Sequence, residues 1–427
     1  MSSNIKDIKV GLFGPGNVGS GVLSILKKNK NIIQKNSNIN FLIHKILVRD
    51  KNDEKYSHLN KEKLVTDYNL ILDDEEISVI IETMGGIDFS DKVITTALIK
   101  GKIVITANKD LLFSELNKYI DLCKKYGGNI GFEAAVCGGI PIINTLLNTM
   151  QSDNISICSG IMNGTTNYIL SEMEKGDKYL KDIIVEAQEK GYAEPDPTSD
   201  VEGFDIKYKI GILAKIIYGM SVNFKEIWSQ GISRITNDDF KYSNMLNSTI
   251  KMIAYLKKID NSLKIIVTPM IVNKKYIESN VKGATNMVFL KSKNLEQQFL
   301  IGEGAGKFPT ANSIISDLIN LTSGKTYYNG INKNTFMIND KWKSRFYIRF
   351  RAEDNIGLIS NISKLCVNNN ISINSILQLP IENYKNIVFV LITEECNNKN
   401  IKNLIKDINK EKILLKDTPF YMPIYER

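Results

Sequence analysis

Hydrophobic residues in the first 150 positions occur as short, nearly continuous apolar runs, and the segments between them carry apolar residues at helical spacing. Such runs are typical of strands buried on both faces, and their alternation with amphipathic helices is typical of a parallel sheet. This part of the chain therefore predicts an α/β fold with a doubly wound parallel sheet. The expected strands are residues 8–14, 41–48, 78–83, 102–107 and 129–136, and the expected helices are 17–28, 89–100 and 110–126.

The pattern changes after about residue 150, where long helical segments precede a series of closely spaced β-branched runs. Strands separated by short turns favour antiparallel or mixed pairing, so we expect an α+β domain here. Its expected strands are 155–163, 264–272, 276–283, 284–292 and 297–304, and its expected helices are 165–175, 178–190, 202–219, 237–257 and 309–321.

The last part of the chain predicts a separate small unit. Residues 326–343 are polar and lack periodicity, which is typical of a linker. Strand and helix patterns then follow in the order β-α-β-β-α-β, which predicts a ferredoxin-like fold over residues 344–427. Its expected strands are 345–353, 371–380, 386–396 and the tail, and its expected helices are 355–369 and 399–410.

Composition excludes several classes of protein. The 427 residues are 43% hydrophobic and 24% charged, as in ordinary globular proteins. The net charge of +8 is spread along the chain, whereas nucleic-acid binders concentrate basic residues in a stripe. No apolar run is long enough for a membrane span or a signal peptide. The five scattered cysteines form no CxxC pair, which favours a reducing, cytoplasmic setting.

Histidine is the residue whose scarcity restricts the chemistry most. The chain has only two, His44 and His58. A zinc site built on histidines is therefore nearly excluded, and so is a Ser-His-Asp triad unless one of these two serves in it. Acid–base chemistry must come from Lys, Asp, Glu or Tyr side chains.

A glycine loop follows the first expected strand. Residues 14–19 read Gly-Pro-Gly-Asn-Val-Gly, a G-x-G-x-x-G pattern that directly precedes a helix. In this setting Gly14 permits a tight turn, Gly16 lets the backbone approach a pyrophosphate, and Gly19 allows close packing of helix and strand. The helix N-terminus then offers free N–H groups to phosphates. The loop predicts a Rossmann-type dinucleotide site.

The choice between NAD and NADP is open at this level. The second strand ends in Leu47-Val48-Arg49-Asp50. An acid at this place would bind the ribose 2′-hydroxyl of NAD, and an arginine would bind the 2′-phosphate of NADP. Both types are present, and we favour NADP because Arg49 comes first and Lys51 is close.

Two lysines are the candidate proton donors. Lys109 follows the carboxyl end of strand 102–107, the edge at which doubly wound sheets bind ligands. Lys209 lies four residues after Asp205 on an expected helix, so both side chains face one way. Glu194 and Asp200 lie in the acidic, proline-containing turn before that helix. A surface ion pair between Asp205 and Lys209 is the alternative interpretation.

Glu133 begins a turn, Glu133–Pro141, that ends one strand and starts a helix. A carboxylate together with backbone carbonyls can hold a hard or alkali cation. The spacing alone is a weak indication, because a plain helix-start turn is the commoner meaning.

Taken together, these segments resemble homoserine dehydrogenase. The matching segments are GLFGPGNVG, TANKDL, FEAAVCGGIP, GIMNGTTNYI, EAQEKGYAEPDPTSDVEGFDIKYKIGILA and GEGAGKFPTANSIISDL, in the family's order over about residues 8–321. The C-terminal unit resembles an ACT regulatory domain, although its opening, Glu353–Gly357, lacks the usual proline. No aspartate kinase segment precedes these motifs, so the chain resembles the monofunctional form.

The resemblance implies reversible NAD(P)H-dependent reduction of L-aspartate 4-semialdehyde to L-homoserine, in threonine and methionine biosynthesis. It implies a Rossmann domain at residues 1–150 completed by about 305–322, a catalytic and dimerisation domain at 151–325, and an ACT domain at 344–427. Threonine is the expected effector, and a homodimer or homotetramer is the expected assembly. No nucleic acid or membrane partner is expected.

The resemblance also implies roles for single residues. Lys209 corresponds to the general acid and Lys109 to its partner in the proton relay. Glu194, Asp205 and Asp200 correspond to the substrate site, chiefly for its ammonium group. The implied sodium ligands are the Glu133 side chain and the carbonyls of Val136, Gly138 and Ile140. The positions expected at the cofactor are Phe13, Gly14, Gly16, Asn17, Val18, Gly19, Arg49, Thr83, Lys109, Gly191 and Gly306.

Two other interpretations stay open here. An enzyme that forms an acyl intermediate, such as aspartate semialdehyde dehydrogenase, needs a nucleophilic cysteine with a base beside it. Cys137 is the only cysteine near the proposed site, and a histidine partner for it is not evident. A catalytically silent sensor that joins a nucleotide domain to an ACT domain would have no need of the lysines and acids named above.

Overall fold

A computed structural model describes residues 5–328, 331, 333–334, 336–339, 341–380, 387–410 and 415–427. The chain divides into two compact units, each assembled from separate segments. The first unit comprises Met1–Ile155, Tyr208–Phe224 and Lys293–Thr335, and the second comprises Ser156–Lys207, Lys225–Ser292 and Phe336–Arg427.

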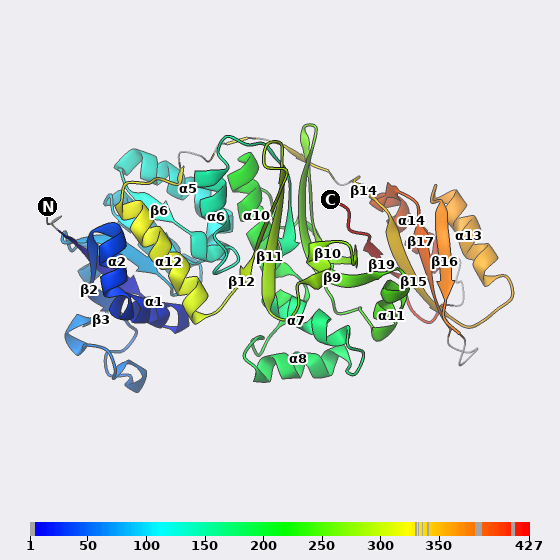
Figure 1. Cartoon of the computed structure of the whole chain (residues 1–427), viewed down its shortest axis with the longest axis horizontal. Helices are drawn as coiled ribbons and strands as arrows, with labels where there is room; N and C mark the ends of the chain where they lie inside the picture. Colours follow the sequence, from blue (N-terminus) through cyan, green and yellow to red (C-terminus); the bar gives the residue numbers. More distant parts are fainter. Residues whose placement is uncertain are drawn as a thin grey trace. The chain divides into compact units, whose positions relative to one another are not determined.

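The first unit contains the predicted parallel sheet. Its six strands have the order β3-β2-β1-β4-β5-β6, which is the order of the Rossmann fold (Figure 1). All five pairs of neighbouring strands are parallel. The strands are β1 (Lys6–Phe13), β2 (Ile39–Leu47), β3 (Leu64–Val65), β4 (Ile77–Glu82), β5 (Ile103–Thr106) and β6 (Asn129–Gly131).

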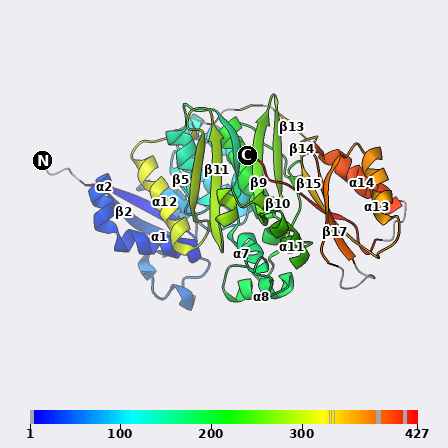
Figure 2. The same cartoon turned by 45° about the vertical axis from the view of Figure 1, so that its right-hand side comes forward.

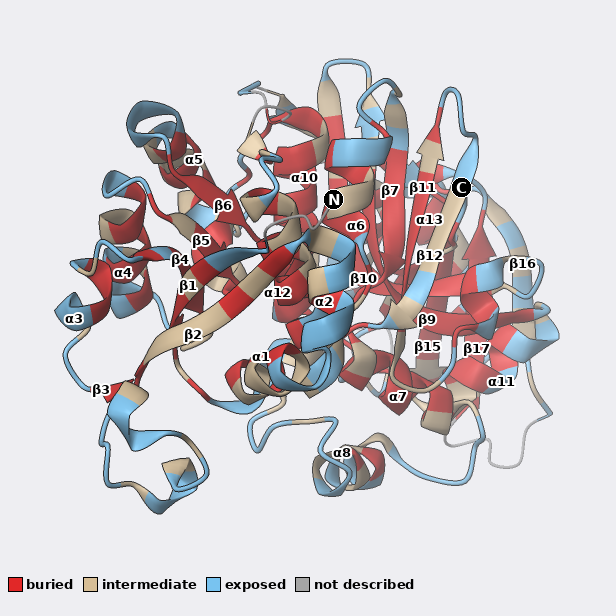
Figure 3. Ribbon diagram, turned by 60° about the vertical axis from the view of Figure 1, so that its left-hand side comes forward, coloured by how far each residue is buried: buried red, intermediate tan, exposed pale blue. Residues whose placement is uncertain are grey.

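Burial explains why the apolar runs form these strands. The carboxyl-terminal halves of β1 and β4 are buried, whereas β2 is only half-buried along its middle (Figure 3). Apolar residues on both faces of a central strand are removed from water by helices on each side. The helices of this unit are α1 (Asn17–Lys28), α2 (Lys30–Ser37), α3 (Asn69–Leu72), α4 (Asp88–Ile99), α5 (Lys109–Tyr126), α6 (Ile142–Asn144) and α12 (Lys307–Thr322).

A late segment of the chain completes the first unit. Helix α12 packs against α1 at Gly21, where an added Cβ would lie 2.7 Å from the Lys307 carbonyl oxygen and 3.0 Å from the Ala311 Cβ. Only a glycine permits this approach of the two helices. Gly306, at the start of α12, is thereby held beside the helix that follows the glycine loop.

The second unit contains a mixed sheet with the order β11-β7-β9-β10-β13. Its longest pair, β9 and β10, is antiparallel over 12 residues of each strand. The strands are β7 (Ile155–Ile161), β8 (Trp228–Ser229), β9 (Ser248–Ile259), β10 (Ser262–Asn273), β11 (Thr285–Ser292) and β13 (Met337–Ile338), and β12 (Gln297–Glu303) follows in sequence. The helices are α7 (Gly164–Met173), α8 (Leu180–Glu189), α9 (Thr198–Val201) and α11 (Asn237–Met245). Helix α10 (Phe204–Tyr218) begins in this unit, and from Tyr208 onward it belongs to the first unit.

The C-terminal part of the second unit has the predicted β-α-β-β-α-β order. Its four strands form an antiparallel sheet with the order β16-β17-β15-β19, and α13 and α14 lie on one face of it (Figure 2). A small pair, β14 (Lys343–Ser344) and β18 (Cys396–Asn397), lies outside this sheet. The elements are β15 (Phe346–Ala352), α13 (Leu358–Asn368), β16 (Ile373–Gln378), β17 (Ile387–Thr393), α14 (Asn398–Lys410) and β19 (Phe420–Pro423).

Three predicted elements are wrong. The expected helix 237–257 ends as α11 at Met245, and the rest is strand β9, because its β-branched residues pair with β10. The expected strand 276–283 is a short 3-10 helix, Ile277–Asn280. The expected strand 129–136 stops at Gly131, since Glu133–Ala135 turns as a 3-10 helix. The predicted linker lies partly outside the described residues.

Two observations bear on the chain's setting. Within the described ranges, no helix is both long enough and apolar enough to cross a membrane. All five cysteines are buried and none is in a disulfide.

Candidate active site

The glycine loop of the first unit is held by close backbone contacts. Gly14 has φ +87°, a conformation that L residues rarely adopt. A Cβ on Gly19 would lie only 2.2 Å from the Gly14 carbonyl oxygen. The Thr83 hydroxyl donates to the carbonyls of Gly14 at 2.7 Å and Phe13 at 3.1 Å. The end of β1, the start of α1 and the end of β4 are therefore fixed together.

Gly16 is the residue of the loop that faces open space. It is the N-cap of α1, it has no side chain to bond the first N–H groups, and an added Cβ would meet nothing within 4 Å. Asn17 and Val18 form the first turn of the helix. Free N–H groups and the positive end of the helix dipole favour a phosphate here.

The positions predicted to select the cofactor, Arg49 and Asp50, lie just after β2. Arg49 and Asp50 are both exposed, and the Asp50 carboxylate accepts a hydrogen bond from the Asn52 N–H at 2.9 Å. In Rossmann folds the residues at the end of the second strand bind a ribose of the dinucleotide, which is why both positions are candidates for its recognition.

Sequence reasoning missed Glu82, a fully buried carboxylate at the end of β4. It accepts hydrogen bonds from the Thr106 hydroxyl at 2.6 Å, the Ser90 hydroxyl at 3.2 Å and the Met84 N–H at 2.8 Å. These bonds join the ends of β4 and β5 at the ligand-binding edge of the sheet. The available signal was an acid that ends an otherwise apolar strand.

Lys109 is the first residue of α5, and Asn108 is its N-cap through a bond from the Leu111 N–H. The Asn108 amide also donates to the Gly86 carbonyl at 2.6 Å, which ties the loop after β4 to the start of α5. The Lys109 ammonium lies 4.0 Å from the Asp110 carboxylate, and its side chain is 32% exposed. It is therefore accessible at the predicted edge of the sheet.

Lys209 lies on α10 and is buried. The first unit packs α10 on α5 through Phe113, whose ring centroid lies 5.4 Å from that of Tyr208. An added Cβ on Gly211 would lie 2.2 Å from the Phe113 ring, so the two helices are in close contact. Lys109 is one turn before Phe113, and Lys209 directly follows Tyr208. Lys109 of α5 and Lys209 of α10 are therefore both near, in sequence, to the residues that form the contact between these two helices.

The acids of the second unit are gathered around Asn163, the N-cap of α7. Its side-chain nitrogen donates to Asp200 at 2.7 Å and to Asp205 at 2.8 Å. Asp205 is buried and Asp200 is half-buried. The structure therefore brings together two of the three predicted substrate ligands.

Glu194, the third predicted ligand, is exposed on the turn that joins α8 to α9. The turn is fixed at two points by its backbone: the Thr165 hydroxyl donates to the Tyr192 carbonyl at 2.6 Å, and the Gln188 amide donates to the Glu194 carbonyl at 3.1 Å. Gly191 has φ +73° and ends α8, as a glycine at this position often does.

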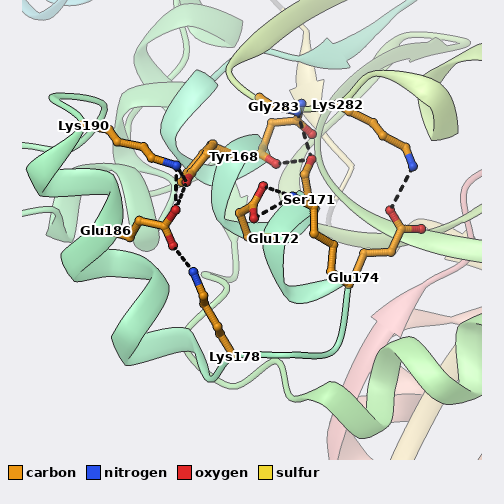
Figure 4. A network of polar contacts seen from close by, with 11 residues as sticks. Tyr168, Ser171, Glu172, Glu174, Lys178, Glu186, Lys190, Lys282 and Gly283 are labelled. Carbon is orange, nitrogen blue, oxygen red and sulfur yellow. Dashed lines mark hydrogen bonds and ion pairs between the residues drawn. The ribbon is translucent and has the colours of Figure 1, made fainter.

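A polar network holds α8 against α7 and so supports this turn (Figure 4). The Glu186 carboxylate accepts bonds from the Tyr168 hydroxyl at 2.9 Å, from Lys190 at 2.6 Å and from Lys178 at 2.6 Å. Bonds from Lys178 and Lys190 lower the pKa of Glu186 to about 2. Glu186 is therefore charged across the physiological range, and the end of α8 is held next to Tyr168.

The predicted cation ligands include one carboxylate, that of Glu133, and it is buried. Glu133 is 1% exposed, and its two oxygens accept bonds from the N–H groups of Ile143 at 2.9 Å and Asn144 at 2.6 Å. Burial, together with the nearby Asp317 carboxylate, raises the pKa of Glu133 to about 8. A bound cation would offset both effects, since an opposite charge favours the carboxylate form.

The carbonyls of this turn can take part as well. The Gly138 carbonyl accepts a bond from the Ser313 hydroxyl at 2.7 Å, and the Ile140 carbonyl accepts one from the Ile142 N–H at 2.8 Å. Each carbonyl oxygen has a second lone pair, so these bonds leave room for a cation ligand. Val136 lies between Glu133 and Gly138 in the same buried turn. The residues present therefore fit an alkali cation.

Comparison with known proteins bears on the whole chain. Residues 14–133 match the model of the homoserine dehydrogenase NAD binding domain, and residues 141–319 match the model of homoserine dehydrogenase. A homoserine dehydrogenase from Bacillus subtilis (strain 168) is 34% identical over 415 residues, which cover 95% of each chain. This chain belongs to the homoserine dehydrogenase family. It is a NAD(P)-dependent oxidoreductase.

Other relatives agree along the full length. A homoserine dehydrogenase from Helicobacter pylori is 32% identical and covers 97% of this chain and 98% of its own. The crystal structure of a homoserine dehydrogenase from Thiobacillus denitrificans superposes with a TM-score of 0.91 at 30% identity, and the match covers 99% of both chains. The similarity to homoserine dehydrogenases thus includes the C-terminal β-α-β-β-α-β region.

Proposed function

We propose that this homoserine dehydrogenase catalyses the reversible NAD(P)H-dependent reduction of L-aspartate 4-semialdehyde to L-homoserine, in threonine and methionine biosynthesis. The observation that carries the proposal is the pairing of Asp205 and Lys209, one helical turn apart on α10 and both buried. A buried acid beside a buried lysine is poorly explained as a surface ion pair. It suits a site that binds an ammonium group and delivers a proton.

We propose that Lys209 is the general acid and Lys109 its partner in the proton relay. The nicotinamide supplies the hydride when it is bound. Negative charge then develops on the aldehyde oxygen, and an ammonium group stabilises it and transfers a proton to it. Asp205, Asp200 and Glu194 would bind the substrate ammonium.

The cofactor would bind along the first unit. Phe13, Gly14, Gly16, Asn17, Val18 and Gly19 would form the phosphate loop, with Thr83, Lys109, Gly191 and Gly306 at other parts of the cofactor. We propose NADP as the preferred cofactor because Arg49 is exposed at the ribose position. We also propose that Glu133 and the carbonyls of Val136, Gly138 and Ile140 hold sodium.

The direct test is oxidation of NADPH and NADH with L-aspartate 4-semialdehyde in phosphate-free buffer. Turnover without phosphate supports the proposed reaction and ranks the two cofactors. Turnover that requires phosphate would instead indicate an acyl-transfer enzyme. That enzyme would need a reactive cysteine, and Cys137, the cysteine next to the proposed site, is fully buried.

The Lys209→Ala variant tests the acid role. We expect kcat to fall by ~10²–10⁴-fold, the contribution of a positioned general acid. Lys209→Arg should lose similar activity, since a guanidinium keeps its proton near neutral pH. Lys215→Met is the matched control, because Lys215 is also buried on α10 but donates to the Gly219 carbonyl. Near-normal kcat in Lys209→Ala would remove Lys209 from the acid role.

The C-terminal region is proposed to be an ACT domain that responds to threonine, and the assembly to be a homodimer or homotetramer. The β-α-β-β-α-β order supports the first proposal. A cytoplasmic location is likewise proposed, because all five cysteines are buried and none is in a disulfide. Activity and melting temperature measured with millimolar threonine test the effector. No change in either would refute threonine regulation.

A further inference from the structure

The N-cap of α7 has a side chain that bonds in two directions. The Asn163 Oδ1 accepts the Thr166 N–H at 2.8 Å and so caps the helix. This cap fixes which end of the amide is oxygen, and the nitrogen must therefore face the opposite way. There it donates to Asp200 at 2.7 Å and to Asp205 at 2.8 Å.

The Asn163 amide holds the two carboxylates next to each other. They share one nitrogen as hydrogen-bond donor, so two of their oxygens lie close together, and like charges at short range repel. An amide group has two N–H donors and no charge. It can satisfy one oxygen of each carboxylate and hold both without neutralising either.

The local burial makes the amide hard to replace. Asn163 is 5% exposed, Thr165 is 8% exposed and Thr166 is fully buried. Asn163 directly precedes Gly164, the first residue of α7, so the helix fixes the position of its side chain. Asn163 in this way links the start of α7 to Asp200 of α9 and to Asp205 at the start of α10.

We propose that Asn163 is a positioning residue that sets the two carboxylates for the ammonium group of an α-amino acid substrate. This inference rests on the proposed function, because it takes Asp200 and Asp205 as substrate ligands. A pair of pre-oriented carboxylates recognises an ammonium group. An aldehyde that has no ammonium group would gain little binding energy from these carboxylates. Asn163 therefore contributes to selection for the amino-acid substrate.

The test is the Asn163→Asp variant. Aspartate is as good an N-cap as asparagine, so α7 keeps its cap, but both N–H donors are replaced by a charged acceptor. We expect KM for L-homoserine to rise by ~10–100-fold, the loss expected for hydrogen bonds to charged groups. KM for the cofactor should change little, whereas the melting temperature should fall, because the variant places a third carboxylate beside two others. Asn163→Ser, which keeps a cap without adding charge, should give an intermediate KM.

The pH dependence of KM for L-homoserine distinguishes a positioning role of Asn163 from general damage to the fold. Three clustered carboxylates raise one another's pKa, and a proton shared among them restores a donor. The Asn163→Asp defect in KM should therefore shrink as pH falls from 8 toward 5.5, while the defect of Asn163→Ser should not. A structural role alone would give a pH-independent defect that raises KM for the substrate and for the cofactor alike.

The outcomes are distinct. Unchanged KM for L-homoserine in both variants, with an active wild type, would overturn the role of Asn163 and leave the proposed reaction standing. Equal increases in KM for substrate and cofactor would also overturn it. An inactive wild type with either cofactor would refute the proposed function and this inference with it.

Discussion

At the scale of single residues, the second unit contains a lysine whose burial opposes its charge. Lys251, on β9, is 0% exposed, and its ammonium donates to the Val281 carbonyl at 2.7 Å. Burial lowers the pKa of Lys251 to about 8. The protonated form is therefore disfavoured in the folded state relative to the unfolded chain, and the group costs stability below that pH.

The sign of the pH dependence follows from this shift. Between about pH 8 and 10.5 the unfolded chain holds a proton on Lys251 that the folded protein has released, so stability rises with pH. We expect the free energy of unfolding, relative to Lys251→Met, to rise by about 3 kcal/mol over this window. The Val281 carbonyl keeps the Asn167 amide as a donor in the variant. Urea denaturation at several pH values tests this, and parallel curves for both proteins would contradict it.

At the scale of elements, the turn from β1 into α1 contains one glycine that the fold requires and one that it does not. Gly19 is required by the fold, because its Cβ would overlap the Gly14 carbonyl. Gly16 has open space around it and φ −72°, so the fold accepts a side chain there. Within one motif, Gly19 is therefore required for folding, whereas the fold does not require a glycine at position 16.

Two alanine variants distinguish these constraints. Gly16→Ala should keep the melting temperature of the wild type and weaken NADPH binding by at least about 10-fold, because a Cβ blocks approach of the pyrophosphate. Gly19→Ala should lower the melting temperature, since the turn must shift. Thermal melting and NADPH titration measure both. Normal NADPH affinity in Gly16→Ala would place the phosphates elsewhere.

At the scale of the whole chain, the end of the sequence is part of the second unit's core. The Tyr425 N–H donates to the Ile271 carbonyl of β10 at 2.9 Å. The Tyr425 hydroxyl donates to Glu278 at 2.8 Å, and the Arg427 guanidinium also bonds this fully buried carboxylate. The C-terminal region is thus not detachable from the central sheet of its unit.

Removing residues 424–427 should therefore destabilise the protein by ~3–5 kcal/mol, because Glu278 loses its buried cationic partner. Tyr425→Phe, which removes the hydrogen bonds of the hydroxyl to Glu278 and to Ser159, should cost about 1–3 kcal/mol. Adding Glu278→Gln to the shortened chain should recover part of the loss, since no buried charge is left. Urea unfolding gives all four values. A shortened chain as stable as the wild type would show that Glu278 does not depend on the tail.

Prediction from sequence succeeded where the evidence was periodic or local. Strands β1, β2, β4 and β5, the glycine loop and the C-terminal β-α-β-β-α-β order each depend on apolar spacing or on neighbouring glycines. It failed at 237–257, where Met245 ends a helix and a strand begins without a strong breaker between them. It also failed at 276–283, whose β-branched residues form a 3-10 turn.

The sequence by itself determined the order of elements, the dinucleotide loop and the family, because apolar periodicity and short motifs are written along the chain. Only the tertiary structure decided which buried polar groups meet. Glu82 with Thr106, Asn163 with two carboxylates, and Glu278 with the tail join segments that are distant in sequence. A buried polar side chain must find a partner wherever folding brings one, and no spacing along the chain encodes that partner.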